Sequence, residues 1–405
     1  MVDNMSLNKI INRVEQNSGY VIDLTRRLIR IPSINPPGNE SEVAQIVGEE
    51  LESLGFRVEY VVPKEKRVNV IATLKGSGGG KSILFNGHLD VVPPGDLENW
   101  SFDPFEGVIK NGRIYGRRAA DMKGAIAAII GAVKSIVDSE VKLRGDLIIH
   151  AVADEEAGGK LGTGYLVEKG YARADGAVVT EGSVFNGEIC LRPAVRGLCW
   201  IEVETRGRAA HASKPWAGVN AVLHMAKVLL ALKQYELKCP PHKYLPPPTI
   251  SPGTVIRGGV KTNIIPDKCI AHLDVRINPG LTCNDVLKQL NKLFDEMRKE
   301  DRTLQVSAKI ITSCPPAEVS ENAEIVSCAK WAYKQITGKE LKFKCAYGTN
   351  DAHYLINRAK IPTLCGFGPG DHETGNAHGP DENVDINVLK TFTKIYALMI
   401  YKFTS

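Results

Sequence analysis

The sequence predicts an α/β fold in which a larger domain with a largely parallel central sheet is interrupted by an inserted α+β domain. Strand-like and helical runs alternate through the first half of the chain. Those strand-like runs are continuously apolar, as in parallel sheets covered on both faces. After Arg192 the pattern changes to long strands with alternating polar and apolar residues. We therefore expect residues 1–194 and 312–405 to form the larger domain and residues 195–311 the insertion.

The elements of the first half follow from hydrophobic periodicity. Apolar residues at helical spacing predict helices over 43–54, where Gly55 stops the helix, over 125–137 and, shorter, over 162–170. Apolar runs predict strands, and we expect them over the ranges 56–62, 67–74, 81–92, 146–153 and 176–181. After the insertion, an amphipathic run over 387–403 predicts a closing helix.

The insertion reads as a complete small domain. Strands are expected at 195–207, 254–259, 268–277 and 304–312, with helices at 218–235 and 283–299. This β-α-β-β-α-β order is that of ferredoxin-like units. The Pro-rich stretch 238–253 is predicted to be an exposed loop.

Composition excludes several classes of function. The formal net charge of +5 over 405 residues, without a basic cluster, gives no indication of nucleic-acid binding. No apolar run is long enough to span a membrane, and the first residues lack the apolar core of a signal peptide. Nine scattered cysteines form no CxxC pair, which disfavours a disulfide framework or a cysteine zinc site. We expect a reduced cytoplasmic protein.

Two polar features adjoin apolar elements in the first half. His88 and Asp90 lie two residues apart at the end of an extended run, so they share a side, and Asp90 is placed to orient a metal-binding His88. Asp121 precedes the apolar helix 125–137, where a helix cap is the alternative to a metal ligand. Each feature alone also fits an ordinary polar pair or cap.

More acidic residues follow buried strands. Asp154, Glu155 and Glu156 come after 146–153, and Glu181 ends 176–181. Parallel-sheet enzymes place their chemistry at such carboxyl ends, and adjacent acids repel unless a cation or proton intervenes. One of the two glutamates can bind metal while its neighbour acts as a base. With His378 in a Gly-rich loop, two histidines and three carboxylates suit two ions that share a bridging carboxylate.

A family resemblance covers nearly the whole chain. Its motifs, in chain order, are IPSINPPGNE, GHLDVVP, GVIKNGRIYGRRAADMKG, ADEEAGG, TEGS, RGRAAHAS, GGVKTNIIP, DVRINPG, GTNDAHYL and GPG…AHGPDENV. The chain resembles the dinuclear-zinc amidohydrolases that include acetylornithine deacetylase, succinyl-diaminopimelate desuccinylase, aminoacylase and carboxypeptidase G. The resemblance implies a zinc-aminopeptidase-like catalytic domain and an inserted lid and dimerisation domain, hence a homodimer.

The resemblance also implies roles for the residues of the centre. His88 and Glu181 would bind one zinc ion, and Glu156 and His378 the other. Asp121 would bridge the two, in the family often with a cis peptide bond after it. Asp90 would orient His88, and Glu155 would be the general base and later the acid. Cobalt can replace zinc in such a donor set, so the ligand types alone do not identify the metal.

Further residues are implied outside the metal set. His211 would reach the active site, often in the partner subunit, and stabilise the oxyanion. Arg276 would bind a substrate carboxylate, with Asn263 a further contact, and Thr349, Asn350 and Asp351 would line the pocket. We prefer His378 to His372 as the ligand, because AHGPDE carries the motif. Arg118 departs from the family, whose members commonly have glycine there, and Arg is costly if the position needs a positive φ.

The expected activity is removal of an acetyl or succinyl group from an N-acyl amino acid by a metal-activated water. The alternative is a metallo-carboxypeptidase or dipeptidase acting on short peptides. A metal-binding relative without catalysis is a minor alternative, disfavoured because every candidate ligand and Glu155 are present. One structural zinc is disfavoured because closed Cys/His spacing is absent.

Overall fold

The computed structural model describes residues 3–405 and divides into two compact units. The larger unit contains residues 3–194, 318–346 and 350–405, and the inserted unit contains residues 195–317 with 347–349. The chain leaves the larger unit within β10 (Ala194–Val195) and returns within β15 (Ala317–Glu318). No helix of residues 3–405 is long and apolar enough to cross a membrane.

The larger unit is built on a six-stranded sheet with the order β1-β2-β6-β3-β7-β17. Its strands are β1 (Arg57–Lys64), β2 (Arg67–Leu74), β6 (Leu147–Val152), β3 (Ile83–His88), β7 (Gly176–Val179) and β17 (Thr363–Leu364). From β6 to β17 every neighbouring pair is parallel, whereas β1–β2 and β2–β6 are antiparallel. The expected mixed α/β fold with a largely parallel central sheet is confirmed, with an antiparallel hairpin at one edge.

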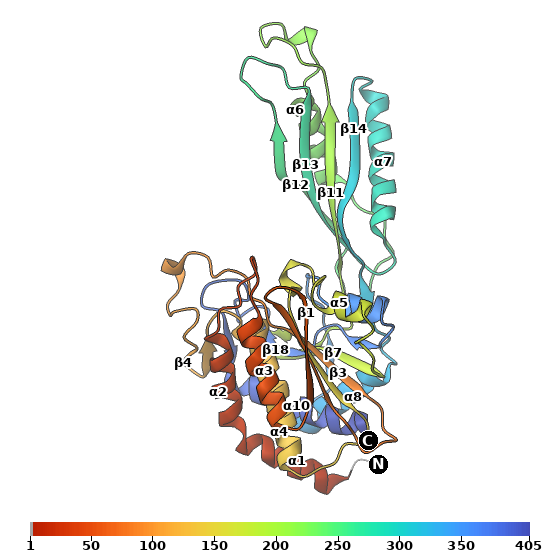
Figure 1. Ribbon diagram of the computed structural model, residues 1–405. Helices are drawn as coiled ribbons and strands as arrows, with labels where there is room; N and C mark the ends of the chain where they lie inside the picture. Colours follow the sequence, from red (N-terminus) through yellow and green to blue (C-terminus); the bar gives the residue numbers. More distant parts are fainter. Residues whose placement is uncertain (1–2) are drawn as a thin grey trace. The chain divides into compact units, whose positions relative to one another are not determined.

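Helices cover both faces of this sheet (Figure 1). They are α1 (Asn4–Gln16), α2 (Ser18–Ile29), α3 (Ser41–Ser53), α4 (Gly124–Asp138), α5 (Thr163–Glu168), α8 (Glu324–Thr337), α9 (Ala352–Asn357) and α10 (Ile386–Thr404). Successive strand residues face opposite sides, so Val70 and Ala72 of β2 join the main core while Ile71 packs with Leu166 of α5. No elements were predicted for the residues of α1 and α2, although both helices bury an apolar stripe.

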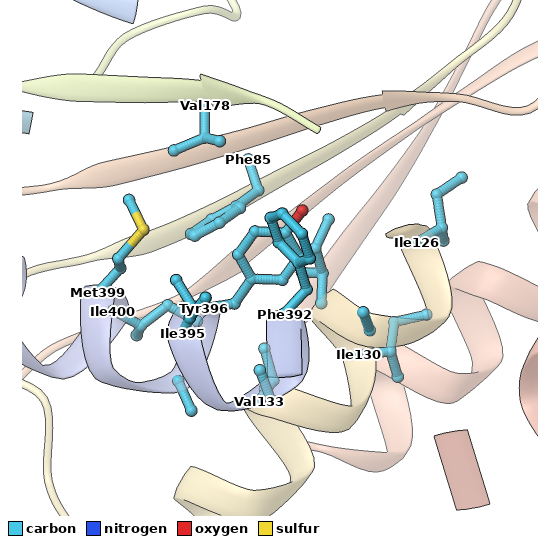
Figure 2. Close-up of a cluster of buried hydrophobic side chains, with 14 of the residues drawn as sticks. Phe85, Ile126, Ile130, Val133, Val178, Phe392, Ile395, Tyr396, Met399 and Ile400 are labelled. Atoms are coloured by element: carbon cyan, nitrogen blue, oxygen red, sulfur yellow. The ribbon is translucent and has the colours of Figure 1, made fainter. Parts of the chain in front are cut away.

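The main core lies between the sheet and the helix pair α4 and α10 (Figure 2). Phe85 of β3 and Tyr396 of α10 meet edge to face, with ring centroids 5.3 Å apart. The buried Tyr396 hydroxyl donates to the carbonyl oxygen of Phe367 at 2.6 Å, so its polar atom is satisfied. This packing fixes strand β3, whose last residue is His88.

Two smaller sheets lie wholly within the larger unit. One has the order β16-β9-β8-β18 and the other β19-β5-β4. Their strands are β16 (Lys342–Phe343), β9 (Glu188–Leu191), β8 (Gly182–Phe185), β18 (Gly368–Asp371), β19 (Asn383–Asp385), β5 (Arg113–Tyr115) and β4 (Val108–Lys110). The loop that carries His378 runs between β18 and β19, so these sheets anchor it at both ends.

The inserted unit is a four-stranded antiparallel sheet with the order β12-β13-β11-β14. Its elements are β11 (Gly197–Arg206), α6 (Ala221–Gln234), β12 (Thr249–Gly258), β13 (Lys268–Ile277), α7 (Cys283–Glu300) and β14 (Gln305–Cys314). Their sequence is the ferredoxin-like β-α-β-β-α-β order. Two details differ from expectation. Strand β12 begins at Thr249, inside the predicted Pro-rich loop, and β14 ends at Cys314 rather than at 312, because Cys314 still pairs with Leu198.

Candidate metal centre

Three neighbouring parallel strands bring their carboxyl ends to one edge of the central sheet. His88 is the last residue of β3, Glu155 and Glu156 follow β6, and Glu181 follows β7. Donor atoms of His88, Glu155 and Glu181 lie within 4.8 Å of one another, and so do those of His88, Asp121 and Glu156. The position after a parallel strand was therefore an informative signal.

Asp121 is held in an irregular turn, Ala119–Lys123, that leads into α4. The peptide bond between Asp121 and Met122 is cis, as the resemblance implied. The Glu382 carboxylate accepts the main-chain N–H groups of Ala120 at 3.2 Å and of Asp121 at 3.0 Å. It also accepts from buried Arg117 at 2.7 Å. Glu382 thus fixes the backbone that carries Asp121.

The Asp121 carboxylate lies between two histidines. Its Oδ1 is 3.1 Å from His88 Nε2, and its Oδ2 is 3.2 Å from His378 Nε2. His378 Nε2 is also 3.1 Å from Glu156 Oε1. Ligand atoms about 2.0–2.1 Å from a tetrahedral ion are about 3.3 Å apart, so these spacings fit ions between the residues. One carboxylate that faces two separate histidines has the geometry of a bridging ligand.

His88 is fully buried and strongly paired. Its Nδ1 lies 3.1 Å from the main-chain oxygen of Asp90 and 3.6 Å from the Asp90 carboxylate. Burial opposes a charge on His88, but hydrogen bonds to Asp121 and Asp90 outweigh it and hold its pKa well above the ordinary value. The shorter contact between Asp90 and the His88 ring is therefore made by the main-chain oxygen of Asp90, and its carboxylate lies slightly farther away.

The Asp90 carboxylate holds a different part of the centre. It accepts the main-chain N–H groups of Glu155 and Glu156, each at 3.1 Å, and the side-chain amide of Asn35 at 2.8 Å. Burial would raise the Asp90 pKa, but His88 and Asn35 lower it to about 2. The Asp90 carboxylate, whose pKa is lowered, therefore anchors the turn that carries both glutamates.

Glu155 and Glu156 differ in their surroundings. Burial, followed by the charge of Glu181, raises the pKa of Glu155 well above its ordinary value. Glu156 instead accepts from the guanidinium of Arg118 and lies beside His378. One carboxylate thus favours a proton while its neighbour lies among cations, which suits a division between base and ligand.

Glu181 is oriented by two buried side chains. Asn350 donates to its Oε2 at 3.0 Å, and Arg192 Nη1 lies 3.4 Å from the same oxygen. The Asn350 amide also donates to the Cys365 carbonyl at 2.6 Å, so both of its N–H bonds are occupied within the protein. Asn350, predicted as a substrate contact, therefore positions Glu181 in this structure.

The two residues beside Asn350 in the chain belong to different units. Asp351 is buried and accepts from the Thr163 hydroxyl at 2.7 Å, and burial raises the pKa of Asp351 to about 7. Thr349 belongs to the inserted unit, where its hydroxyl donates to the Arg196 carbonyl at 2.8 Å.

Within the inserted unit, His211 and Asn263 lie together. His211 pairs with Ile264 across a short β-bridge, and Ala212 N–H donates to the Asn263 carbonyl at 3.0 Å. An open hollow of about 380 Å³ is lined by Ala209, Ala210, His211, Lys261, Asn263 and Ile264. The Ser213 N–H donates to His211 Nδ1 at 3.2 Å, so in the neutral ring the proton is on Nε2.

Arg276 lies on β13 and already has a carboxylate partner. Its Nε and Nη2 donate to the two oxygens of Asp274 at 2.7 and 3.1 Å. A substrate carboxylate would use Nη1 or displace Asp274.

His372 is engaged elsewhere. Its Nε2 lies 2.8 Å from the Gly182 carbonyl, and its ring stacks on Phe185 at a centroid distance of 4.7 Å. A carbonyl oxygen can only accept, so Nε2 carries the proton there. This geometry favours His378 over His372 as a ligand.

Several residues that position the centre were not predicted from the sequence. Glu382 holds Asp121, and Arg192 lies beside Glu181. Glu382 stands in the same motif as His378, which was the available signal. Arg67 joins Glu40 and Asp154 in buried ion pairs at 3.0 and 2.9 Å, and no local pattern marks it.

Comparisons with known proteins agree with this geometry. The family model described as Peptidase family M20/M25/M40 matches residues 84–402. The N-formyl-4-amino-5-aminomethyl-2-methylpyrimidine deformylase of Halalkalibacterium halodurans is 30% identical over 427 residues, covering 98% of this chain and 97% of the relative. The succinyl-diaminopimelate desuccinylase of Nitratiruptor sp. is 31% identical over 399 residues, covering 95% of this chain and 100% of the relative.

Solved structures show the same fold. An M20 family metallo-carboxypeptidase from Sulfolobus solfataricus superposes with a TM-score of 0.76 at 21% identity, covering 95% of this chain and 99% of its own. A dipeptidase from Saccharomyces cerevisiae gives a TM-score of 0.78 at 16% identity, covering 98% of both chains. The family resemblance drawn from the sequence motifs is confirmed. The chain therefore belongs to Peptidase family M20/M25/M40, and it is a metal-dependent amidohydrolase.

Proposed function

We propose that the protein removes an acyl group from an N-acylated amino acid, using two zinc ions held by His88, Asp121, Glu156, Glu181 and His378. The single observation that carries the proposal is the Asp121 carboxylate, whose two oxygens face His88 and His378 at 3.1 and 3.2 Å. The two-histidine, three-carboxylate donor set suits zinc, and cobalt is an accepted substitute.

Bound divalent ions would supply an activated water with a pKa of roughly 7 and would polarise the amide carbonyl. The protein's own groups then move the protons. Glu155, whose pKa is raised by burial and Glu181, takes a proton from the attacking water. The same carboxyl group then protonates the leaving amine. Asp90 fixes the Glu155 main chain, so the base keeps its place during both transfers.

His211 is proposed to donate a hydrogen bond to the developing oxyanion, in its own chain or a partner's. The Ser213 N–H on Nδ1 supports this, because it leaves the Nε2 proton free to donate. Arg276, Asn263 and Thr349 stay proposed substrate contacts. For Asn350 we propose positioning of Glu181 instead, because its amide is fully used.

We also propose a cytoplasmic homodimer that associates through the inserted unit. All nine cysteines are free, which supports a reducing compartment. Large apolar residues of the inserted unit are exposed, among them Leu223 and Leu230 of α6 and Ile311 of β14. Light scattering on the intact protein and on a Leu223→Lys, Leu230→Lys variant tests the dimer.

A substrate panel tests the reaction class. The relatives are named for deformylation and desuccinylation, so the panel contains N-formyl, N-acetyl and N-succinyl amino acids, together with dipeptides. We expect the highest kcat/KM on an N-acyl amino acid. A preference for dipeptides over all N-acyl compounds would establish the peptidase alternative, which the carboxypeptidase and dipeptidase neighbours keep as the second candidate.

A further inference from the structure

Arg118 has an unfavourable backbone conformation within the metal centre. Its φ of 77° and ψ of 13° lie in the left-handed region, which glycine adopts readily and larger residues seldom do. The family resemblance places glycine at this position in many relatives, and Arg118 is costly there because φ is positive. Strained residues at functional sites are retained when their side chains contribute to the site, so the Arg118 side chain is the feature to explain.

The Arg118 side chain is fully buried and ends among proposed metal ligands. Its guanidinium contacts Glu156 Oε1 and the main-chain oxygen of Asp121, and Nη1 lies 3.3 Å from Asp121 Oδ2. His378 Nε2 approaches the same two carboxylate oxygens at 3.1 and 3.2 Å. The guanidinium therefore occupies the oxygens that an ion bound by Asp121, Glu156 and His378 would need.

The other half of the centre differs. His88 Nε2 faces Asp121 Oδ1, whereas the oxygen of this carboxylate that lies 3.3 Å from Arg118 is Oδ2. Arg192 lies 3.4 Å from Glu181 Oε2, but its Nη1 is closer to the Gly182 carbonyl, at 3.0 Å. The arginine beside Glu181 thus divides its contacts, whereas Arg118 is directed onto both carboxylates of the second set.

We propose that Arg118 makes the Asp121–Glu156–His378 half a weak metal site, so that the protein holds one ion tightly and a second ion far more weakly. The inference rests on the proposed dinuclear centre. A second ion must displace the guanidinium from Glu156 and then remain close to a positive charge that cannot be lost. Repulsion between cations a few ångströms apart is large inside a protein.

Metal binding, measured without turnover, tests the proposal. Metal-free protein is titrated with Zn²⁺ against a chromophoric chelator, and bound metal is counted by mass spectrometry after dialysis at fixed free Zn²⁺. The variants are Arg118→Gly, which also relieves the backbone, Arg118→Met, which keeps the bulk, and Arg118→Lys, which keeps the charge. Lys160→Met, at an exposed site, is the control for the change in net charge.

We expect the two dissociation constants of the wild type to differ by at least about 100-fold. In Arg118→Gly and Arg118→Met the ratio of the two constants should be smaller than in the wild type by a factor of about 10 or more. Arg118→Lys and Lys160→Met keep the wild-type separation. Two equally tight ions in the wild type, or an unchanged separation in both Arg118→Gly and Arg118→Met, would overturn the proposal while leaving the dinuclear centre intact. Absence of any tight ion in every variant would instead refute the proposed function itself.

Discussion

The carboxylate of Asp90 accepts the main-chain N–H of Glu155 at 3.1 Å. Asp90, just after β3, therefore holds the proposed base, which comes just after the neighbouring strand β6. The second Asp90 oxygen accepts the N–H of Glu156 at the same distance. Because β3 and β6 are parallel neighbours, this link joins the His88 side of the centre to the glutamate side.

Replacing Asp90 with Asn should lower kcat about 10- to 100-fold, because an amide cannot accept both N–H groups and also the Asn35 amide. Steady-state kinetics together with metal analysis measures the effect. An Asp90→Asn enzyme with unchanged kcat and metal content would show that the turn carrying Glu155 and Glu156 keeps its conformation without the Asp90 carboxylate.

Glu155→Gln should lower kcat by about 100- to 10,000-fold while the metal content stays that of the wild type, because the amide cannot accept the proton from water. The metal content is measured on the same samples as the rate. Glu168→Gln on the exposed end of α5 serves as the matched control and should be fully active. Wild-type turnover by Glu155→Gln would refute the base assignment.

His211→Ala should lower kcat by about 100- to 1,000-fold with little change in metal affinity, the usual consequence of losing one oxyanion donor. Ser213→Ala removes the hydroxyl that lies 2.7 Å from His211 Nδ1, and it should have a smaller effect because the Ser213 main-chain N–H on Nδ1 is retained. If His211→Ala loses metal and keeps its rate per bound ion, the residue acts on the metal instead.

Chelation should abolish activity, and added Zn²⁺ or Co²⁺ should restore it, because the proposed chemistry needs a metal-activated water. Activity is followed during dialysis against chelator and during back-titration. Full turnover by protein shown to be free of metal would contradict the two-metal proposal.

His150 should make the protein less stable in mild acid. Burial lowers the pKa of His150 to about 4, so the folded state binds fewer protons than the unfolded state between about pH 6.5 and 4. The contribution of the neutral ring is complete above pH 6.5 and is lost as the pH falls through this window, by up to about 3 kcal/mol. Denaturant unfolding of wild type and His150→Asn across that range should show a shallower pH dependence for the variant. Parallel curves would mean that His150 does not titrate on unfolding.

Local pattern predicted the fold class and the residues at strand ends, because burial imposes a period on the sequence that can be read directly. His88, Glu156 and Glu181 were selected on that basis, and the structure brings donor atoms of Glu156 and of Glu181 each within 4.8 Å of His88. Glu382 and Arg192 could not be assigned in this way. Their contacts depend on which groups the folded chain places beside them, and the motif that contains Glu382 does not reveal that its carboxylate accepts from Ala120 and Asp121.

Two further residues illustrate what local pattern can and cannot specify. Arg118 was recognised as a departure from the family that would be costly at a positive φ, and its φ is 77°. The direction of its side chain became apparent only once Glu156 and Asp121 were placed around it. Asn350 was chosen from a family motif, but the motif does not reveal whether an amide faces a ligand or a neighbouring carboxylate.

The order in which the core is assembled has a consequence for synthesis. Strands β3 and β7 precede the inserted unit in the chain, whereas α10, which covers Phe85 and Val178 in the core, follows it. At ordinary elongation rates the roughly 200 residues between them take about 10–40 s to make. During that interval the inserted unit, which is nearly continuous in sequence, can fold on the ribosome. The apolar face of the central sheet that α10 packs against stays without that helix for the same time. Nascent-chain stability should therefore depend on chaperone access to that sheet face more than on the inserted unit.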